Sequence, residues 1–240
     1  MTRVLEVVEA GLVPYAAALA WQRRLAEDRI ARRLPHDLLL LLEHPPVITL
    51  GRTAREANVL RPDGIDVVEV ERGGDATYHG PGQMVGYPII DLTGLRPDLH
   101  WYLRTLEEAL ITGLAGLAIA AERRPGYTGV WTRGRKIASI GVHVKQWVTW
   151  HGFALNVTTD LTAFERIVPC GIAGVTMTSV ERELRREPGA GSREPALWPR
   201  TLDAVVRGFE AAFGFRAVPR ELPVPAASAE PPRPSAGRTA

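Results

Sequence analysis

Residues 129–157 decide the fold, and they read GVWTRGRKIASIGVHVKQWVTWHGFALNV. Residues 128–131 and 137–144 flank a Gly-containing turn, which predicts two paired strands. A further strand is predicted over 148–157. Because side chains alternate along a strand, one set is expected to face the core and the other to face away. The inward set is Ala138, Ile140, Val142 and Val144, and the outward set is Ser139, Gly141 and His143.

Working outward from this stretch, the chain alternates between short apolar runs and helical patterns. The run Asp37-Leu-Leu-Leu-Leu-Leu-Glu43 is short and wholly apolar, which favours a buried central strand over a helix. Strands are also predicted over 4–8, 47–50, 67–71, 83–92 and 119–123. Helices are predicted over 14–33, 98–117, 161–167 and 202–213. Asp98 and Asp160 are predicted to cap the N-termini of two of these helices, and Thr178 with Glu181 is predicted to form a capping box for another. Residues 187–199 are predicted to form a loop.

Composition indicates an ordinary globular protein. Of 240 residues, 45% are hydrophobic and 23% are charged. The net charge is only +2, which gives no sign of a nucleic-acid-binding surface. No segment is apolar for long enough to span a membrane, and the N-terminus is no secretory signal, so a cytoplasmic protein without a membrane partner is expected. We predict a single domain over 1–218 and a disordered Pro-rich tail over 219–240.

Cys170 is the only cysteine, and Lys136 and Lys145 are the only lysines among 29 Lys and Arg residues. Lysine can give up its proton in a suitable environment, whereas arginine stays charged. Cys170 and Lys136 are therefore a candidate nucleophile and its activating base. Taken singly, Cys170 also fits a small buried hydrophobe, and Lys136 fits a solvated turn residue in Arg133-Gly-Arg-Lys136.

The other candidate is the loop Arg72-Gly-Gly-Asp-Ala-Thr-Tyr-His-Gly-Pro-Gly82. It lacks the Walker ending and precedes a strand, so it is not a nucleotide fingerprint. Its glycines allow a ligand close to the backbone, although a plain surface connection fits equally. His79, His143 and His151 are too widely spaced for a local zinc motif.

Several of these motifs, taken together and in order, resemble the lipoyl(octanoyl) transferases. They are the segment 72–83 (RGGDATYHGPGQ), 134–141 (GRKIASIG), 151–156 (HGFALN), and Pro169-Cys-Gly171 followed by Thr178-Ser179. The resemblance covers residues 38–180. It implies the α+β fold of the biotin/lipoate protein ligase catalytic domain, a mixed β-sheet flanked by helices.

The resemblance also implies a reaction, a set of partners and a set of site residues. The reaction is transfer of an octanoyl group from acyl carrier protein to a lysine of a lipoyl domain through a thioester on Cys170, with Lys136 favouring the thiolate. The implied acceptors are the lipoyl domains of 2-oxoacid dehydrogenase complexes and the glycine cleavage H protein. No cofactor, ATP or metal is implied, and a monomer is expected. The implied substrate-binding residues are Arg72, Gly73, Gly74, Asp75, Ala76, Thr77, Tyr78, His79, Ser139, Ile140, Gly141, Gly152, Phe153 and Ala154.

Three other functions remain open on sequence grounds. A lipoate or biotin protein ligase would share the fold and use ATP. A binding module would hold an acylated partner without chemistry. A cysteine hydrolase would need a His–Asp pair beside Cys170, which the sequence does not make clear; His79 precedes His151 as the candidate histidine.

Overall fold

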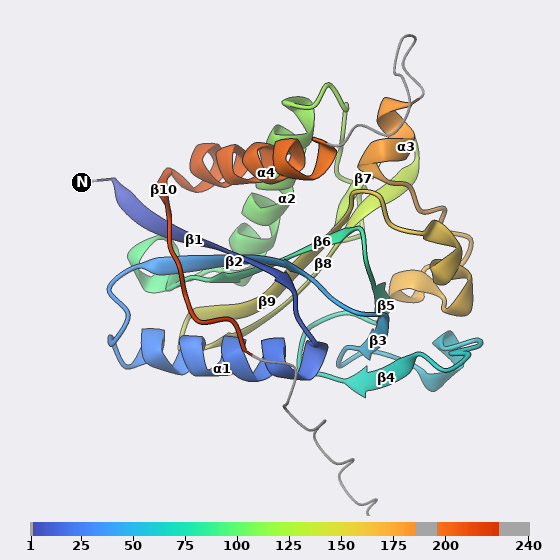
Figure 1. Ribbon diagram of the computed structural model, residues 1–240, viewed down its shortest axis with the longest axis horizontal. Helices are drawn as coiled ribbons and strands as arrows, with labels where there is room; N and C mark the ends of the chain where they lie inside the picture. Colours follow the sequence, from blue (N-terminus) through green and yellow to red (C-terminus); the bar gives the residue numbers. More distant parts are fainter. Residues whose placement is uncertain (1, 186–195, 226–240) are drawn as a thin grey trace, which may run out of the picture.

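The computed structural model describes residues 2–185 and 196–225, and these residues form two sheets (Figure 1). The larger is a mixed sheet of seven strands in the order β10-β1-β2-β6-β9-β8-β7. Strands β10, β1 and β2 run parallel, and each pairing from β2 to β7 is antiparallel. The bounds are β1 Arg3–Leu12, β2 Asp37–Glu43, β6 Gln83–Ile89, β7 Val130–Thr132, β8 Arg135–Lys145, β9 Val148–Asn156 and β10 Phe215–Pro219.

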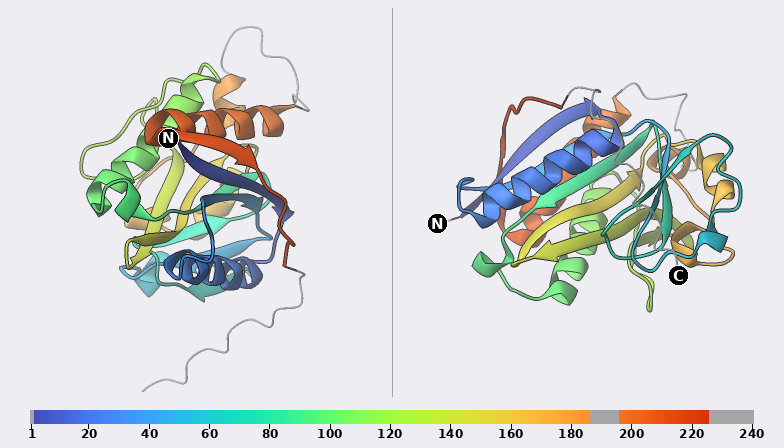
Figure 2. Two further views of the ribbon diagram at one scale, coloured as in Figure 1. Left: turned by 90° about the vertical axis from the view of Figure 1, so that its left-hand side faces the viewer. Right: turned by 90° about the horizontal axis from the view of Figure 1, so that it is seen from below.

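A smaller sheet lies at one end of the large one, as Figures 1 and 2 show. In the part of the chain that the structure describes, it has the strand order β4-β3-β5. The bounds are β3 Val47–Leu50, β4 Asp66–Glu69 and β5 Ala76–His79. A short 3₁₀ turn, η3 (Leu161–Arg166), packs on this sheet through Phe164, whose ring lies edge-on to that of Tyr78.

Helices cover both faces of the large sheet (Figure 1). Helices α2 (Leu99–Ala115) and α4 (Leu197–Phe213) pack on one face, and α1 (Tyr15–Ile30) packs on the other. The position of β2 in the sheet explains why its sequence is apolar throughout. Leu39 and Leu41 belong to the core under α2 and α4, while Leu38, Leu40 and Leu42 belong to the core over α1. A strand buried on both faces requires this continuous run.

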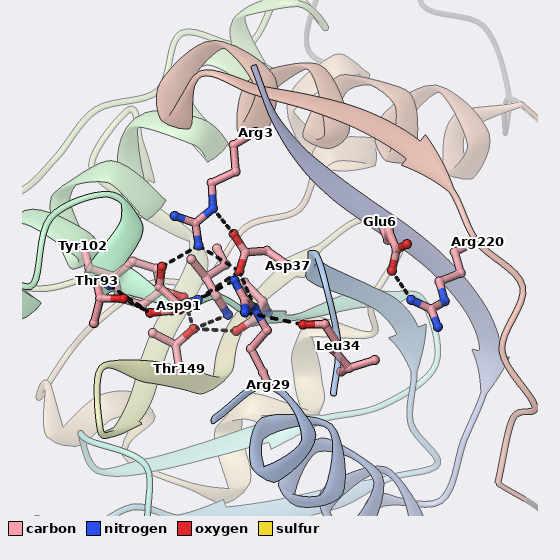
Figure 3. A network of polar contacts seen from close by, with 12 residues as sticks. Arg3, Glu6, Arg29, Leu34, Asp37, Asp91, Thr93, Tyr102, Thr149 and Arg220 are labelled. Atoms are coloured by element: carbon pink, nitrogen blue, oxygen red, sulfur yellow. Dashed lines mark hydrogen bonds and ion pairs between the residues drawn. The ribbon is translucent and has the colours of Figure 1, made fainter. Parts of the chain in front are cut away.

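A buried carboxylate fixes one edge of this core (Figure 3). Asp37 is fully buried at the start of β2 and accepts hydrogen bonds from Arg3 Nε at 2.6 Å and Arg29 Nε at 3.0 Å. It also accepts from the backbone N–H of Asp91 at 3.0 Å. The network joins β1, the last turn of α1 and β2. A nearby ion pair between Glu6 and Arg220 joins β1 to the segment after β10.

The structure confirms most of the predicted elements and the α+β fold. Strands β2 and β3 have the predicted bounds, and the Asp98 side chain caps α2 by accepting from the Trp101 N–H. Asp160 likewise caps η3. Of the helices in the described ranges, none is both long and apolar enough to cross a membrane.

Four predictions were wrong. Residues 119–123 form no strand, only a bridge between Glu122 and Trp131. The capping residue of α3 (Val180–Leu184) is Ser179, because its hydroxyl is the one that accepts from the Arg182 N–H. The loop predicted up to 199 ends earlier, since α4 starts at Leu197 and tolerates a proline in its first turn. The Gly-rich loop contains β5, which was not predicted.

Two predictions fall partly outside the described residues. The loop predicted over 187–199 is described only from residue 196, and the tail predicted over 219–240 only up to residue 225.

Candidate active site

Cys170 sits at a tight turn that presents its side chain. The turn is η4 (Pro169–Gly171), in which Cys170 has φ 57° and ψ 20°. This left-handed conformation is unfavourable for a residue with a side chain and is retained when surrounding contacts impose it. Here the N–H groups of Gly171 and Ile172 donate to the carbonyls of Val168 and Pro169, at 3.0 and 3.1 Å. The thiol is half-buried.

Lys136 approaches Cys170 from β8, 34 residues earlier in the chain. Its Nζ lies 3.0 Å from Cys170 Sγ and donates to the carbonyl of Thr128 at 3.3 Å. The ammonium also lies 4.9 Å from the centre of the Trp131 ring, a cation–π distance. Only 1% of the lysine is exposed. A side-chain nitrogen this deeply buried requires polar partners, which the Cys170 sulfur and the Thr128 carbonyl provide.

Gly129 makes room for the lysine. A Cβ there would stand 2.9 Å from Lys136 Cε and 2.7 Å from the carbonyl oxygen of Ala138, and its φ of +136° is accessible only to glycine. The buried carboxylate of Glu107, on α2, accepts a hydrogen bond from the Gly129 N–H at 3.0 Å. Helix α2 therefore fixes the backbone that surrounds the ammonium.

A chain of buried amides supports the site from behind. His79 Nδ1 lies 2.8 Å from Gln83 Oε1, and Gln83 Nε2 donates to Asn156 Oδ1 at 3.0 Å. Asn156 Nδ2 in turn donates to the carbonyl of Thr178 at 3.0 Å, and the N–H of Thr178 donates to the carbonyl of Lys136 at 2.9 Å. Burial lowers the pKa of His79 well below its usual value. The imidazole is thus neutral, with Nδ1–H donating to Gln83.

Arg72 shapes the Gly-rich loop. Its guanidinium is buried and donates to the carbonyls of Thr49 at 2.7 Å, Asp75 at 2.8 Å and Gly73 at 3.0 Å. The N–H of Gly73 donates to the carbonyl of Val142 on β8 at 2.9 Å. The Arg72 guanidinium, which the resemblance implies binds substrate, therefore makes most of its hydrogen bonds within the protein, and it holds the loop against β8.

One cavity of about 210 Å³ connects these groups. Its wall includes Cys170, Lys136 and most of the substrate-binding residues implied by the resemblance. Those that line it are Arg72, Gly74, Asp75, Thr77, His79, Ser139, Ile140, Gly141, Gly152, Phe153 and Ala154. Three of the implied residues do not line it: Gly73, Ala76 and Tyr78. Ala76 and Tyr78 alternate with Thr77 and His79 along β5 and pack in the core of the small sheet instead.

Several cavity residues are not among the catalytic and substrate-binding residues implied by the resemblance. They are Tyr15, Val85, Tyr87, Gly126, Tyr127, Thr128, His151 and Ile172. The alternation of β6 places Val85 and Tyr87 on one face, so a period-two pattern could have identified that pair. Tyr15 begins a helix far away in the sequence, and no local signal marks it.

The end of the cavity away from the thiol is polar. His151 has φ 54°, is 1% exposed, and its Nε2 has no hydrogen-bond partner among the described residues. Burial lowers the pKa of His151, although Glu71 at 3.7 Å opposes this. Partial burial disfavours the charge on Glu71, but its neighbours His151, Arg23 and Trp150 hold the pKa of Glu71 well below its usual range. His151 is thus a neutral imidazole beside a carboxylate that stays charged.

A second buried histidine lies against this end of the cavity. His44 Nδ1 lies 2.6 Å from the Val13 carbonyl, and its Nε2 lies 2.6 Å from the Tyr87 hydroxyl. Burial lowers the pKa of His44 to about 4. The neutral ring donates from Nδ1 and accepts the Tyr87 proton at Nε2. Among the described residues, no group of three or more His, Cys, Asp or Glu side chains is arranged to hold a metal ion.

The chain is similar to known proteins both in its sequence and in its fold. An octanoyltransferase of Gloeobacter violaceus is 60% identical over 167 residues, covering 69% of this chain and 75% of that protein. One from Nostoc sp. is 47% identical over 211 residues, covering 87% and 91%. A lipoate-protein ligase A bound with ATP shares the fold with a TM-score of 0.68 at 18% identity, covering 92% of this chain and 90% of that one.

A protein of T. acidophilum described as a putative lipoate protein ligase shares the fold with a TM-score of 0.67 at 16% identity, covering 92% of this chain and 88% of that one. The sequence pattern of the lipoyl protein ligase A/B catalytic domain matches residues 14–197. The chain belongs to the family defined by that catalytic domain.

Proposed function

We propose that the protein is an octanoyltransferase of lipoate biosynthesis that works through an acyl-thioester on Cys170. The octanoyltransferase activity follows from relatives that are 47–60% identical over most of the chain. The observation that supports the covalent route is the 3.0 Å contact between Lys136 Nζ and Cys170 Sγ at the wall of the cavity. An ammonium at this distance favours the thiolate, which is the nucleophilic form.

In the first half-reaction, the Cys170 thiolate attacks the thioester carbonyl of octanoyl-acyl carrier protein. The carbon–sulfur bond to the phosphopantetheine arm breaks, and that sulfur takes a proton from Lys136 and leaves as a thiol. Ser139 Oγ, 3.6 Å from Cys170 Sγ, is placed to donate a hydrogen bond to the sulfur. The product is an octanoyl-enzyme beside a neutral lysine.

The acyl chain would lie along the β8–β9 pair. Ser139 pairs with Ala154, and the polar end at His151 is three residues further along β9, which corresponds to about 10 Å. Ile140, Phe153 and Val85 give this part of the cavity apolar walls. The length suits a medium-chain acyl group, and the polar end disfavours a longer apolar chain that would reach it.

The acceptors are proteins with lipoyl domains, and we propose that they include those of 2-oxoacid dehydrogenase complexes and the glycine cleavage H protein. A lysine of the acceptor attacks the octanoyl-enzyme to give an amide. Activity as a monomer stays a prediction, which sedimentation during turnover would check.

An ATP-dependent ligase is the nearest alternative, because a lipoate-protein ligase A has this fold. The two differ in the donor. The proposed enzyme octanoylates a lipoyl domain from octanoyl-acyl carrier protein with no nucleotide present, whereas a ligase requires ATP and a free acid. A product formed only from ATP and octanoate would overturn the proposal.

A cysteine hydrolase is disfavoured by the partners of the thiol. Within the described residues, Cys170 makes side-chain hydrogen bonds to Lys136 and Ser139 and to no histidine. His79 donates to Gln83 instead.

A further inference from the structure

The second half-reaction releases two protons, and Lys136 alone can accept only one of them. This reasoning rests on the proposed function. The side chain of the acceptor lysine has a pKa of about 10.4, so it arrives as an ammonium. Its nitrogen carries three protons, and the amide product keeps one of them. Two protons must leave. Lys136, neutral after the first half-reaction, takes one and returns to its charged form, so the second requires another acceptor.

Asp75 is placed to meet this need. Among the described residues that line the cavity, it is the only carboxylate. Its Oδ2 lies 2.6 Å from the position that a Cβ on Gly171 would occupy, so the carboxylate lies against the residue that follows the nucleophile. Gly171 has a φ of +67°, and its lack of a side chain leaves this approach open.

The carboxylate is also held to the catalytic turn. Asn58 Nδ2 donates to Asp75 Oδ2 at 2.8 Å, and the Asn58 carbonyl accepts from the N–H of Val168, just before the turn, at 2.8 Å. Asp75 Oδ1 accepts from the Ala76 N–H at 2.6 Å. Each carboxylate oxygen has about two acceptor positions, so these bonds leave one on each oxygen for an incoming ammonium.

The cavity histidines are poorer candidates for this task. His79 is buried, and its Nδ1 is engaged by Gln83. His151 lies three residues along β9 from the partner of Ser139, about 10 Å from the thiol end. Asp75 is half-buried, and the neighbouring Gly74 is exposed, which gives the proton a way to solvent.

We propose that Asp75 binds the ammonium of the acceptor lysine and accepts the second proton released on amide formation. The lysine nitrogen forms a bond to the octanoyl carbonyl carbon, and the bond from that carbon to Cys170 sulfur breaks. The sulfur leaves as a thiolate. One proton of the ammonium passes to Lys136, and the other passes to Asp75 and then to water. The first half-reaction uses no ammonium substrate and does not need Asp75.

The test separates the two half-reactions in Asp75→Asn. Purified variant is mixed with octanoyl-acyl carrier protein, and the octanoyl-enzyme is followed by intact mass. It is then mixed with a lipoyl domain, and its decay is timed. We expect acylation within about threefold of wild type and aminolysis slower by roughly 100-fold, the scale of general base catalysis. Asp66→Asn, which removes an exposed carboxylate of the small sheet, should change neither rate.

Hydroxylamine gives a sharper control, because this neutral nucleophile needs to lose only one proton and Lys136 suffices to take it. Hydroxylamine should cleave the octanoyl-enzyme of Asp75→Asn as fast as that of wild type. Aminolysis by the lipoyl domain in the variant should rise about tenfold per pH unit as free amine forms, more steeply than in wild type. Asp75→Glu, which restores a carboxylate, should recover much of the lost rate.

Two results would overturn the role of Asp75. One is equal slowing of acylation, aminolysis and hydroxylamine cleavage, which would indicate that Asp75 only supports the turn. The other is wild-type aminolysis in Asp75→Asn or, if that variant fails to fold, in Asp75→Ser. Absence of an octanoyl-enzyme in the wild-type protein would instead contradict the proposed function, so the two failures are distinct.

Discussion

Replacing Lys136 with methionine tests the proposed activation of the thiol. The change removes the charge while keeping a side chain of similar length in a site that is 1% exposed. At the 3.0 Å separation of Nζ and Sγ, and with an effective dielectric constant near 20, the attraction between ammonium and thiolate is about 5 kcal/mol. Each 1.36 kcal/mol is a tenfold factor, so the upper limit is a loss of about 10⁴ in acylation rate.

Water entering beside the methionine would hydrate the thiolate and recover part of that loss. We therefore expect acylation to slow by between about 100-fold and 10⁴-fold. The assay is single-turnover formation of octanoyl-enzyme by intact mass, together with the rate of Cys170 alkylation by iodoacetamide. Lys145→Met is the matched control, because Lys145 is the other lysine of β8 and is exposed at its end.

Stability must be measured in the same variants. Lys136→Met removes a buried ammonium from its contacts with the Cys170 sulfur and the Thr128 carbonyl, so its free energy of unfolding has to be compared with that of wild type before a lost rate is assigned to the missing charge. Alkylation and acylation at wild-type rates in a folded Lys136→Met protein would refute the proposed role of the ammonium.

Three further results are expected. Cys170→Ser should fold normally but gain no octanoyl mass at position 170, as peptide mapping would show, and an octanoyl group found there would contradict the nucleophile assignment. Gly129→Ala should lower the unfolding free energy by about 1–3 kcal/mol and displace Lys136, because of its positive φ and the contact with Ala138; urea titration and acylation rate measure both, and wild-type values would contradict the packing. Acidification should destabilise the fold between about pH 6.5 and pH 4, because the pKa of His44 falls to about 4 in the folded state, so the unfolded chain binds the proton first. By that linkage His44 accounts for roughly 2–3 kcal/mol across this window, and a flat profile between pH 7 and 5 would contradict it.

The elements with strong local patterns were predictable. The apolar run of β2, the strands β8 and β9, and the cap at Asp98 depend on patterns of adjacent residues, and the structure contains all of them. Strand β10 was missed because its formation depends on parallel pairing with β1, more than 200 residues away in the sequence. Strand β5 was hidden in a Gly-rich loop, where its four residues gain order only by pairing with β3.

The residues of the site likewise fall into those that the sequence could predict and those that only the fold brings together. Cys170 and Lys136 were suggested by their rarity in an Arg-rich chain, and the fold brings them together. Tyr15 and Tyr87 come from α1 and β6, and only the tertiary arrangement brings them to one cavity. The hydrogen bonds from Arg72 to the protein's own carbonyls could likewise not be predicted from the sequence, because these acceptors are backbone atoms.

The central chemistry is most directly examined by one mass measurement on the unmodified protein. The protein is mixed with octanoyl-acyl carrier protein in the absence of ATP, quenched and weighed, and then a lipoyl domain is added. We predict a gain of one octanoyl group located on Cys170, followed by its loss as the lipoyl domain gains the same mass. Octanoylation of the lipoyl domain with no octanoyl-enzyme at any time, or with the group on another residue, would contradict the account.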